Sequence, residues 1–298
     1  MKILGISRSP RFSPNSTARD AAIFEAVGNE LRQMGHTVET EVEDDFTSAD
    51  GYELVFSMGR DLRFLQLLSA EELGGLPVVN SALSLLHGTR TALSALFERE
   101  NVPVAVNIPV LPGTKPTLRH GQRYWLKRGE ACAQSAGDVR LITTPDELAA
   151  ALRDFEARGI REALLSEHIE GDLVKFYGVE GTDFFYHYYP TAKGAFSKFG
   201  LEKHNGAPVG YDFDLRALKA DADRAASLSG LTVYGGDCVV RPDGSFLIID
   251  FNDWPSFSLC CDNAAKAIAE RLCQRAVHQG DGLNALVAAA LRHPVTTH

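Results

Sequence analysis

Three oxygen-bearing side chains between residues 235 and 258, those of Asp237, Asp250 and Asn252, have types and spacing that could bind a metal ion. Apolar runs on either side of Pro242-Asp243-Gly244 predict a β-hairpin, with Asp237 opening the first strand. Asp250 and Asn252 lie two residues apart and therefore point to the same face of the sheet. Such donors suit Mg²⁺, which completes its coordination with water and substrate phosphate oxygens. A turn with solvated acids is the alternative, but polar groups at the tip of a buried strand are costly unless paired or metal-bound.

The same hairpin resembles the C-terminal signature of the ATP-grasp superfamily. In that family an Asp opens one strand, a turn with Gly follows, and the next strand ends in acid-x-Asn before a Pro. The matching residues here are Asp237, Gly244, Asp250, Asn252 and Pro255. The resemblance implies ATP as a cofactor, with Mg²⁺ or Mn²⁺. It also implies an α/β (α+β) ATP-grasp fold, in which an N-terminal parallel α/β lobe is followed by two α+β lobes that sandwich the nucleotide.

Composition sets the broad class of the protein. The chain has 298 residues, 45% hydrophobic and 23% charged, which is typical of a globular protein with two or three packed lobes. A net charge of -9 argues against any nucleic-acid partner beyond ATP, because backbone binding needs a basic surface. No apolar run approaches the roughly 20 residues that span a bilayer, and the first apolar segment is too short for a signal peptide. The five irregularly spaced cysteines indicate reduced thiols, so we expect a cytoplasmic protein without a membrane partner.

Strands alternate with helices in the first 80 or so residues, which predicts a parallel α/β lobe. The expected strands and helices cover residues 2–7, 17–34, 37–42, 53–58, 61–73 and 77–80. The loop after the first strand carries Arg8 and Arg11, at the place where α/β lobes tend to bind ligands. Two arginines at a helix N-terminus favour an anionic acceptor substrate, and an ordinary solvated loop is the alternative. We expect an N-terminal lobe at 1–85, a central subdomain at 86–171 and a C-terminal subdomain at 172–298.

Two basic residues match phosphate-binding positions of the ATP-grasp family. A helix over 89–99 begins near Arg90 and ends before Asn101-Val102-Pro103, whereas the family more often has Lys at the first position and Gly in the turn. Arg can bind a phosphate bidentately, so the match is weakened but kept. Lys127 lies near the end of an expected strand and precedes a small-residue loop at 129–137. By resemblance it is the second phosphate ligand, and an exposed strand residue is the alternative.

The segment from Glu167 to Lys175 resembles the hinge between ATP-grasp lobes. In the family, backbone groups at the end of such a strand bind the adenine edge, and a following acid binds the ribose. By position Glu167, His168 and Ile169 would form the adenine hinge, and Asp172 would bind the ribose. We favour this role for His168 over that of a catalytic base. Lys175 would point away from Asp172 by strand parity and could reach a phosphate.

Residues 193–210 form a polar, basic stretch with little periodicity, which predicts a loop. Near a triphosphate such a loop is a candidate lid, and its Lys198 and Lys203 are candidate catalytic residues. A solvated loop with incidental charge is the alternative. Closing helices are expected at 262–278 and 283–292.

The resemblance covers roughly residues 85–275 and implies a Mg-ATP-dependent ligase that forms ADP. A small-molecule or peptide carboxylate would attack the γ-phosphate, and an amine would capture the acyl phosphate. The substrates cannot be named from the sequence, and the oligomeric state is open, with a homodimer allowed. Two alternatives stay open. Residues 250–256 also resemble the Asp-x-Asn-x-aromatic-Pro signature of the inositol-phosphate kinase branch, although an acidic protein suits polyanionic substrates poorly. A non-catalytic ATP-binding regulatory protein is favoured by Arg90 and by Gly235, where many ligases of the family carry Arg.

Overall fold

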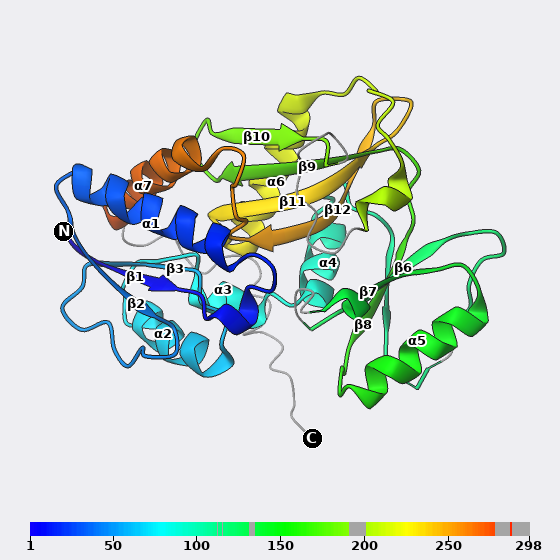
Figure 1. The fold of residues 1–298 in the computed structure, drawn as a ribbon, viewed down its shortest axis with the longest axis horizontal. Helices are drawn as coiled ribbons and strands as arrows, with labels where there is room; N and C mark the ends of the chain where they lie inside the picture. The colour runs from blue at the N-terminus through cyan, green and yellow to red at the C-terminus, as the bar shows by residue number, and fades with distance from the viewer. Residues whose placement is uncertain (112, 115, 131–134, 191–200, 278–286, 288–298) are drawn as a thin grey trace.

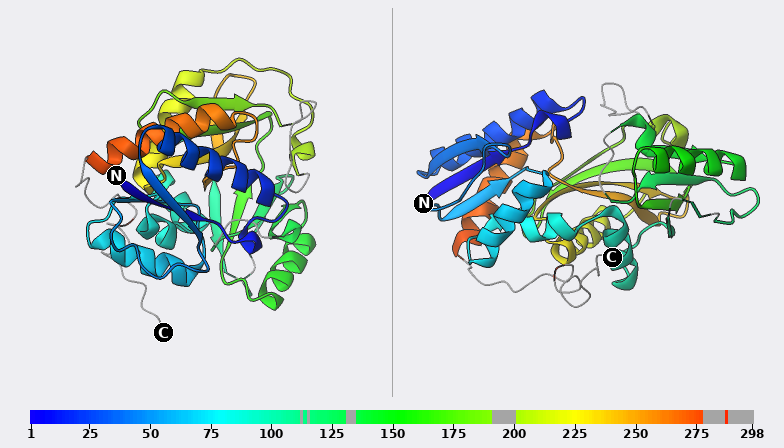
Figure 2. Two further views of the ribbon diagram at one scale, coloured as in Figure 1. Left: turned by 60° about the vertical axis from the view of Figure 1, so that its left-hand side comes forward. Right: turned by 90° about the horizontal axis from the view of Figure 1, so that it is seen from below.

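Three four-stranded sheets organise the chain (Figure 1). The computed structural model describes residues 1–111, 113–114, 116–130, 135–190, 201–277 and 287. Each sheet belongs to one lobe, and we call these the N-terminal, central and C-terminal lobes. The N-terminal and central lobes lie at opposite ends of the molecule, with the C-terminal sheet between them (Figure 2).

The N-terminal lobe contains a parallel sheet in the order β2-β1-β3-β4, as the sequence predicts. Its elements are β1 (Lys2–Ser7), η1 (Pro10–Phe12), α1 (Thr17–Gln33), β2 (Thr37–Val42), β3 (Leu54–Ser57), α2 (Leu62–Leu73), β4 (Val78–Val79) and α3 (Ala82–His87). Asp61 caps α2 by accepting hydrogen bonds from the backbone N–H groups of Arg63 and Phe64. The short helix α3 is a finding that the sequence reading did not anticipate.

The central lobe contains an antiparallel sheet in the order β5-β8-β6-β7. Its elements are β5 (Asn107–Val110), β6 (Tyr124–Arg128), η2 (Ala136–Asp138), β7 (Val139–Ile142), α5 (Pro145–Ala157) and β8 (Ala163–Glu167). Thr144 and Glu147 form a capping box that starts α5. Helix α5 and one face of the sheet bury a core of their own, so this lobe packs as a separate unit.

The C-terminal lobe contains an antiparallel sheet in the order β10-β9-β11-β12. Its elements are β9 (Asp172–Val179), β10 (Phe185–Tyr188), η3 (Glu202–Asn205), α6 (Leu215–Ser229), β11 (Val233–Val240), β12 (Phe246–Asp253) and α7 (Cys261–Val277). The predicted hairpin is present as β11 and β12. Asp237 does not open its strand, however, because β11 already begins at Val233. The expected helix at 283–292 lies outside the described residues except for residue 287.

Two hydrophobic clusters are built from elements that the predicted domain boundaries assign to different lobes. Helices α1 and α7 lie side by side (Figure 1), and the N-terminal sheet and the C-terminal sheet contribute to one hydrophobic cluster. Helix α4 (Arg90–Arg99) packs its apolar face on the C-terminal sheet and α6. By packing, α4 is therefore part of the C-terminal lobe, although it lies within the predicted central subdomain 86–171. The three predicted boundaries stay predictions.

One bidentate contact links the N-terminal lobe to β11. The Asn80 side-chain amide donates to the Val233 carbonyl at 2.8 Å, and its oxygen accepts from the Val233 N–H at 2.7 Å. Asn80 is fully buried, so this contact fixes the parallel sheet against the antiparallel one. In the described parts of the chain, no helix is long and apolar enough to cross a bilayer.

Candidate active site

A cavity of about 490 Å³, which we call the cleft, lies where the three lobes meet. Its walls include side chains from the N-terminal lobe, from β6 of the central lobe, and from β9, β11 and β12 of the C-terminal lobe. Six of the residues predicted for the site line this one cavity: Arg90, Lys127, Lys175, Asp237, Asp250 and Asn252. The structure therefore brings together residues that are up to 162 positions apart in the sequence, from Arg90 to Asn252.

A row of alternating charges crosses three neighbouring strands at the centre of the cleft. Lys175 of β9 stands opposite Asp237 of β11, and Asp237 stands opposite Asp250 of β12. Residues opposite each other in an antiparallel sheet share a face, so the three side chains are neighbours. The Lys175 ammonium lies 2.9 and 3.1 Å from the two Asp237 carboxylate oxygens. The parity prediction that Lys175 faces away from Asp172 is confirmed by this placement.

A β-bulge aims the acids of β12 into the cleft. The pairing of Asp237 with Asp250 is followed by the pairing of Cys238 with Ile248, so Ile249 is an extra residue in the ladder. This extra residue lets Ile248 and Phe251, three apart, both enter the core. Asp250 is thereby turned to the opposite face, towards the cleft. Strict alternation would have placed Ile248 and Asp250 on the same face.

Two further cations meet Asp250 from other elements. The Arg90 guanidinium lies 3.3 Å from the Asp250 carboxylate and donates to the Arg128 carbonyl at 2.7 Å. The Lys127 ammonium donates to the carbonyl of the bulge residue Ile249 at 2.6 Å. Burial alone would raise the Asp250 pKa, but the positive charges of Arg90 and Lys127 outweigh it and lower that pKa to about 2. Burial lowers the pKa of Lys127 to about 8.

The donor set at the hairpin fits a hard divalent cation. Asp237 and Asp250 supply carboxylate oxygens, Asn252 supplies an amide oxygen, and all three line the same cavity. The low pKa of Asp250 keeps its carboxylate ionised at neutral pH. No cluster of three or more His, Cys, Asp or Glu suited to a metal occurs among the described residues. A Mg²⁺ ion held by Asp237, Asp250 and Asn252 would complete its coordination with water and phosphate oxygens, as Mg²⁺ commonly does.

The predicted hinge residues surround a small recess next to the cleft. Glu167, His168 and Ile169 line it together with Trp125 and Lys127. The Trp125 N–H donates to His168 Nδ1 at 2.9 Å, so this nitrogen acts as the acceptor. Burial lowers the His168 pKa, which favours the neutral ring. His168 is thus held as a buried wall residue, in keeping with the hinge role over that of a base, and its binding of adenine stays a prediction.

Asp172 lies away from the cleft in this structure. Its carboxylate accepts three backbone hydrogen bonds from the loop after η3, from Val209 at 2.7 Å, Gly210 at 2.7 Å and Tyr211 at 3.0 Å. Asp172 is buried and lines neither the cleft nor the recess. These contacts argue for loop anchoring, and they do not favour the predicted role in ribose binding.

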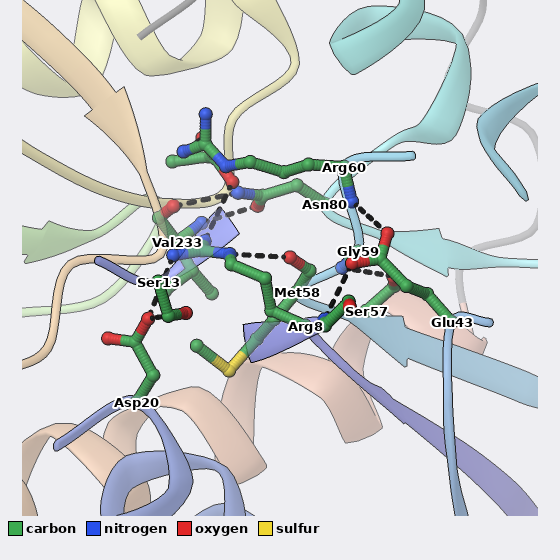
Figure 3. Close-up of polar contacts among 12 residues, drawn as sticks. Arg8, Ser13, Asp20, Glu43, Ser57, Met58, Gly59, Arg60, Asn80 and Val233 are labelled. Atoms are coloured by element: carbon green, nitrogen blue, oxygen red, sulfur yellow. Dashed lines mark hydrogen bonds and ion pairs between the residues drawn. The ribbon is translucent and has the colours of Figure 1, made fainter. Parts of the chain in front are cut away.

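The two candidate arginines of the first loop have different surroundings, and Figure 3 shows those of Arg8. Arg8 lines the cleft, where its guanidinium pairs with Asp20 and Asp253 and donates to the Met58 carbonyl. Arg11 lies outside the cleft, where it is 53% exposed and pairs with two surface acids. The structure therefore separates two residues that the sequence treats alike.

Several cleft residues were not singled out in the sequence. Arg60 enters from the β3–α2 loop, and Trp125 enters from β6. On β6 the residues Tyr124 and Leu126 are buried in the central core, so Trp125 and Lys127 share the other face. That alternation was a signal in the sequence for Trp125, whereas nothing local marks Arg60. Lys198 lies outside the described residues and the Lys203 side chain is not described, so their catalytic roles stay predictions.

Of the comparisons with known proteins, the one with solved structures finds similar folds. No protein-family profile matches the sequence, and no curated protein sequence matches it significantly. The chain is similar to the crystal structure of D-cycloserine synthetase DcsG, with a TM-score of 0.62, 17% identity, and coverage of 91% of this chain and 100% of that one. It is also similar to D-alanyl-alanine synthetase A from Vibrio cholerae, with a TM-score of 0.66, 11% identity, and coverage of 93% and 99%. A RimK domain ATP-grasp protein from Sphaerobacter thermophilus gives a TM-score of 0.61, 18% identity, and coverage of 92% and 100%.

The chain has the ATP-grasp fold. The predicted fold class is therefore confirmed: a parallel α/β lobe is followed by two lobes built on antiparallel sheets. In this chain the cleft lies between those sheets, with the hairpin acids on one side and Lys127 on the other. The matched structures are covered almost completely, so the likeness includes the N-terminal lobe.

Proposed function

We propose that this protein is a Mg-ATP-dependent ligase that joins a carboxylate to an amine through an acyl phosphate. The observation that carries the proposal is the charge row Lys175–Asp237–Asp250, met by Arg90 and Lys127 from other elements. Phosphoryl transfer needs positioning and charge neutralisation more than a nucleophile on the protein. Similar solved structures include ATP-grasp ligases, one of them a D-alanine–D-alanine ligase complexed with ATP.

In this proposal the basic side chains bind the phosphates of ATP, and the acidic and amide side chains bind the metal ion. Arg90, Lys127 and Lys175 would hold the phosphates of ATP, while Asp237, Asp250 and Asn252 would hold Mg²⁺. A bound Mg²⁺ would supply neutralisation of the charge that develops on the transferring phosphoryl group. Binding of nucleotide and metal would compete with the present ion pairs, because Arg90 and Lys175 now face the two carboxylates. All six of these side chains line one cavity, which supports the proposal.

The reaction would proceed in two balanced steps. A carboxylate oxygen of the substrate attacks the γ-phosphorus, and the bond to the β–γ bridging oxygen breaks, so ADP leaves with the electron pair. The amine nitrogen of the second substrate then attacks the acyl carbon, and phosphate leaves. The amine loses a proton to solvent, and the products are an amide, ADP and phosphate.

The acids of the cleft favour a carboxylate acceptor over a hydroxyl. A hydroxyl usually needs a general base, whereas a carboxylate needs no deprotonation. Among the described residues that line the cleft there is no histidine. Its acidic residues all lie in ion pairs with Arg or Lys; they are Asp20, Glu130, Asp237, Asp250 and Asp253.

The proposal is tested by incubating the protein with ATP, Mg²⁺ and a library of amino acids and dipeptides. We expect ADP and free phosphate to form, and added hydroxylamine to trap the activated acid as a hydroxamate. A stable phosphorylated alcohol without free phosphate would instead support the kinase alternative. Binding of Mg-ATP without turnover of any library member would support the regulatory alternative.

A further inference from the structure

Four alternating charges line the end of the cleft that belongs to the N-terminal lobe. Asp20 lies 3.1 Å from Arg8, Arg8 lies 3.5 Å from Asp253, and Asp253 also pairs with Arg60. Asp253 directly follows Asn252, a proposed metal ligand of the hairpin. The order Asp20–Arg8–Asp253–Arg60 places a cation, Arg60, at its end.

The two arginines differ in what they can offer to a ligand. The Arg8 side chain is 8% exposed, and its Nε, Nη1 and Nη2 atoms all contact protein acceptors. The Arg60 side chain is 22% exposed and lines the cleft. Arg8 therefore serves to hold Asp253 in place, whereas the more exposed Arg60 side chain lines the cleft beside it.

The backbone of Arg60 is held by a buried acid. Glu43 is 3% exposed, and its carboxylate accepts from the N–H groups of Ser9, Arg60 and Asp61, with the Ser9 bond at 2.6 Å. Figure 3 shows the contact with Arg60. This one side chain ties the β1–α1 loop to the β3–α2 loop. Arg60 therefore projects from a fixed backbone, which lowers the entropy lost when it binds a ligand.

Gly235 also lines the cleft and has no side chain. A Cβ atom there would lie 2.8 Å from Pro255 Cγ and 2.9 Å from Tyr177 Cδ1, so a larger residue cannot fit without rearrangement. Gly235 lies two residues before Asp237 and shares its face of β11. Gly235 itself cannot supply a cation for a substrate anion, whereas Arg60 lines the same cleft.

We propose that Arg60 is a specificity-determining residue that binds the carboxylate of the acid substrate and turns it towards the γ-phosphate. This proposal rests on the proposed function of the same cleft. A guanidinium matches a carboxylate bidentately, so Arg60 selects a planar anion over a neutral group of the same shape. The substrate class is a free carboxylic acid, and its primary amide is excluded.

The test measures binding without turnover. Wild-type protein is first saturated with Mg²⁺ and a non-hydrolysable ATP analogue. Each amino acid and dipeptide of the library is then titrated into it calorimetrically, and its primary amide is titrated in a parallel experiment. We expect at least one acid to bind and its amide not to bind. Arg60→Gln should raise the dissociation constant of that acid by roughly tenfold to a hundredfold, as expected for loss of a charge-assisted hydrogen bond. Arg60→Lys should recover part of the loss, because Lys keeps the charge without the planar fork.

Arg11→Gln is the matched control, since Arg11 is an exposed arginine outside the cleft that also pairs with acids. It should leave acid affinity unchanged, and all variants should bind the ATP analogue as wild type does. Equal acid affinity in wild type and Arg60→Gln, equal binding of acid and amide, or no acid binding to wild type would each overturn the proposal. If acid binding depends on Arg60 but no ADP or hydroxamate forms with ATP, the role of Arg60 stands and the ligase function fails.

Discussion

Lys127 is the cation whose charge the structure makes most sensitive to pH. Burial lowers its pKa to about 8, while its ammonium contacts the carbonyl of the β-bulge. Because a phosphate binds the protonated form, raising the pH through this pKa should weaken Mg-ATP binding. We expect the dissociation constant to rise by about tenfold per pH unit above about pH 8, following the linkage between proton and ligand binding.

Lys127→Arg provides the control for that dependence. Arg stays protonated across this range, so the variant should bind Mg-ATP with little change between about pH 7 and about pH 9. Calorimetric titrations of both proteins at several pH values give the comparison. A wild-type affinity that is flat with pH, or an Arg variant with the same slope, would contradict the placement of Lys127 at a phosphate.

The sequence identified most of the charged site at the scale of single residues. Arg90, Lys127, Lys175 and Asp250 could be chosen because local motifs mark them, and they do line one cleft. Arg60 could not be chosen, because its role depends on a pairing with Asp253, 193 residues away. Asp172 is the opposite case: its position in the sequence predicts ribose binding, but in the structure its carboxylate anchors a loop.

At the scale of elements, Glu43 connects two loops that form one wall of the cleft. It follows β2 directly and binds backbone groups of the β1–α1 and β3–α2 loops. Glu43→Gln keeps the shape but removes the charge and one acceptor oxygen. We expect the free energy of unfolding to fall by about 1.5–3 kcal/mol, because hydrogen bonds to a buried charged group are lost.

Urea unfolding at neutral pH measures that loss. Glu39→Gln is a suitable comparison, since the Glu39 side chain is about half exposed and pairs with Lys2 at the surface, where such a pair contributes little. An unchanged unfolding free energy in Glu43→Gln would show that the two loops are held by other contacts.

Element boundaries show where sequence patterns succeed and where they do not. Strand β1 and helix α1 match the predicted ranges within one residue because their apolar periods are clear. Strand β5 was missed because its four residues include Pro109, which is tolerated only because β5 is an edge strand. The early start of β11 was missed because Gly235 and Gly236 weaken a strand pattern.

At the scale of the whole molecule, the N-terminal and C-terminal lobes behave as one packed body. They share a hydrophobic cluster and the Asn80–Val233 contact, whereas the central lobe has a separate core. Sequence patterns cannot show this, because α7 and α1 are distant in the chain and meet only in the fold. The shared cluster fixes Arg60 of the N-terminal lobe relative to the hairpin acids of the C-terminal lobe. The central lobe, in contrast, packs around its own core.

The Asn80–Val233 contact can be tested by mutation. Asn80→Ala leaves the buried Val233 N–H without its side-chain acceptor, so we expect the free energy of unfolding to fall by about 2 kcal/mol or more. Asn29→Ala on the exposed face of α1 should change it by less than about 0.5 kcal/mol. Comparable urea midpoints for the two variants would argue against a structural link between the lobes at this position.

The central claim is that a substrate carboxylate attacks the γ-phosphate of ATP. It is tested most directly by preparing the accepted acid with ¹⁸O in its carboxylate and following the label by mass spectrometry during turnover. If an acyl phosphate forms and an amine displaces phosphate, one labelled oxygen must leave the acid and appear in the released phosphate. Label that appears in AMP, or that stays entirely in the organic product while ATP is consumed, would contradict the account.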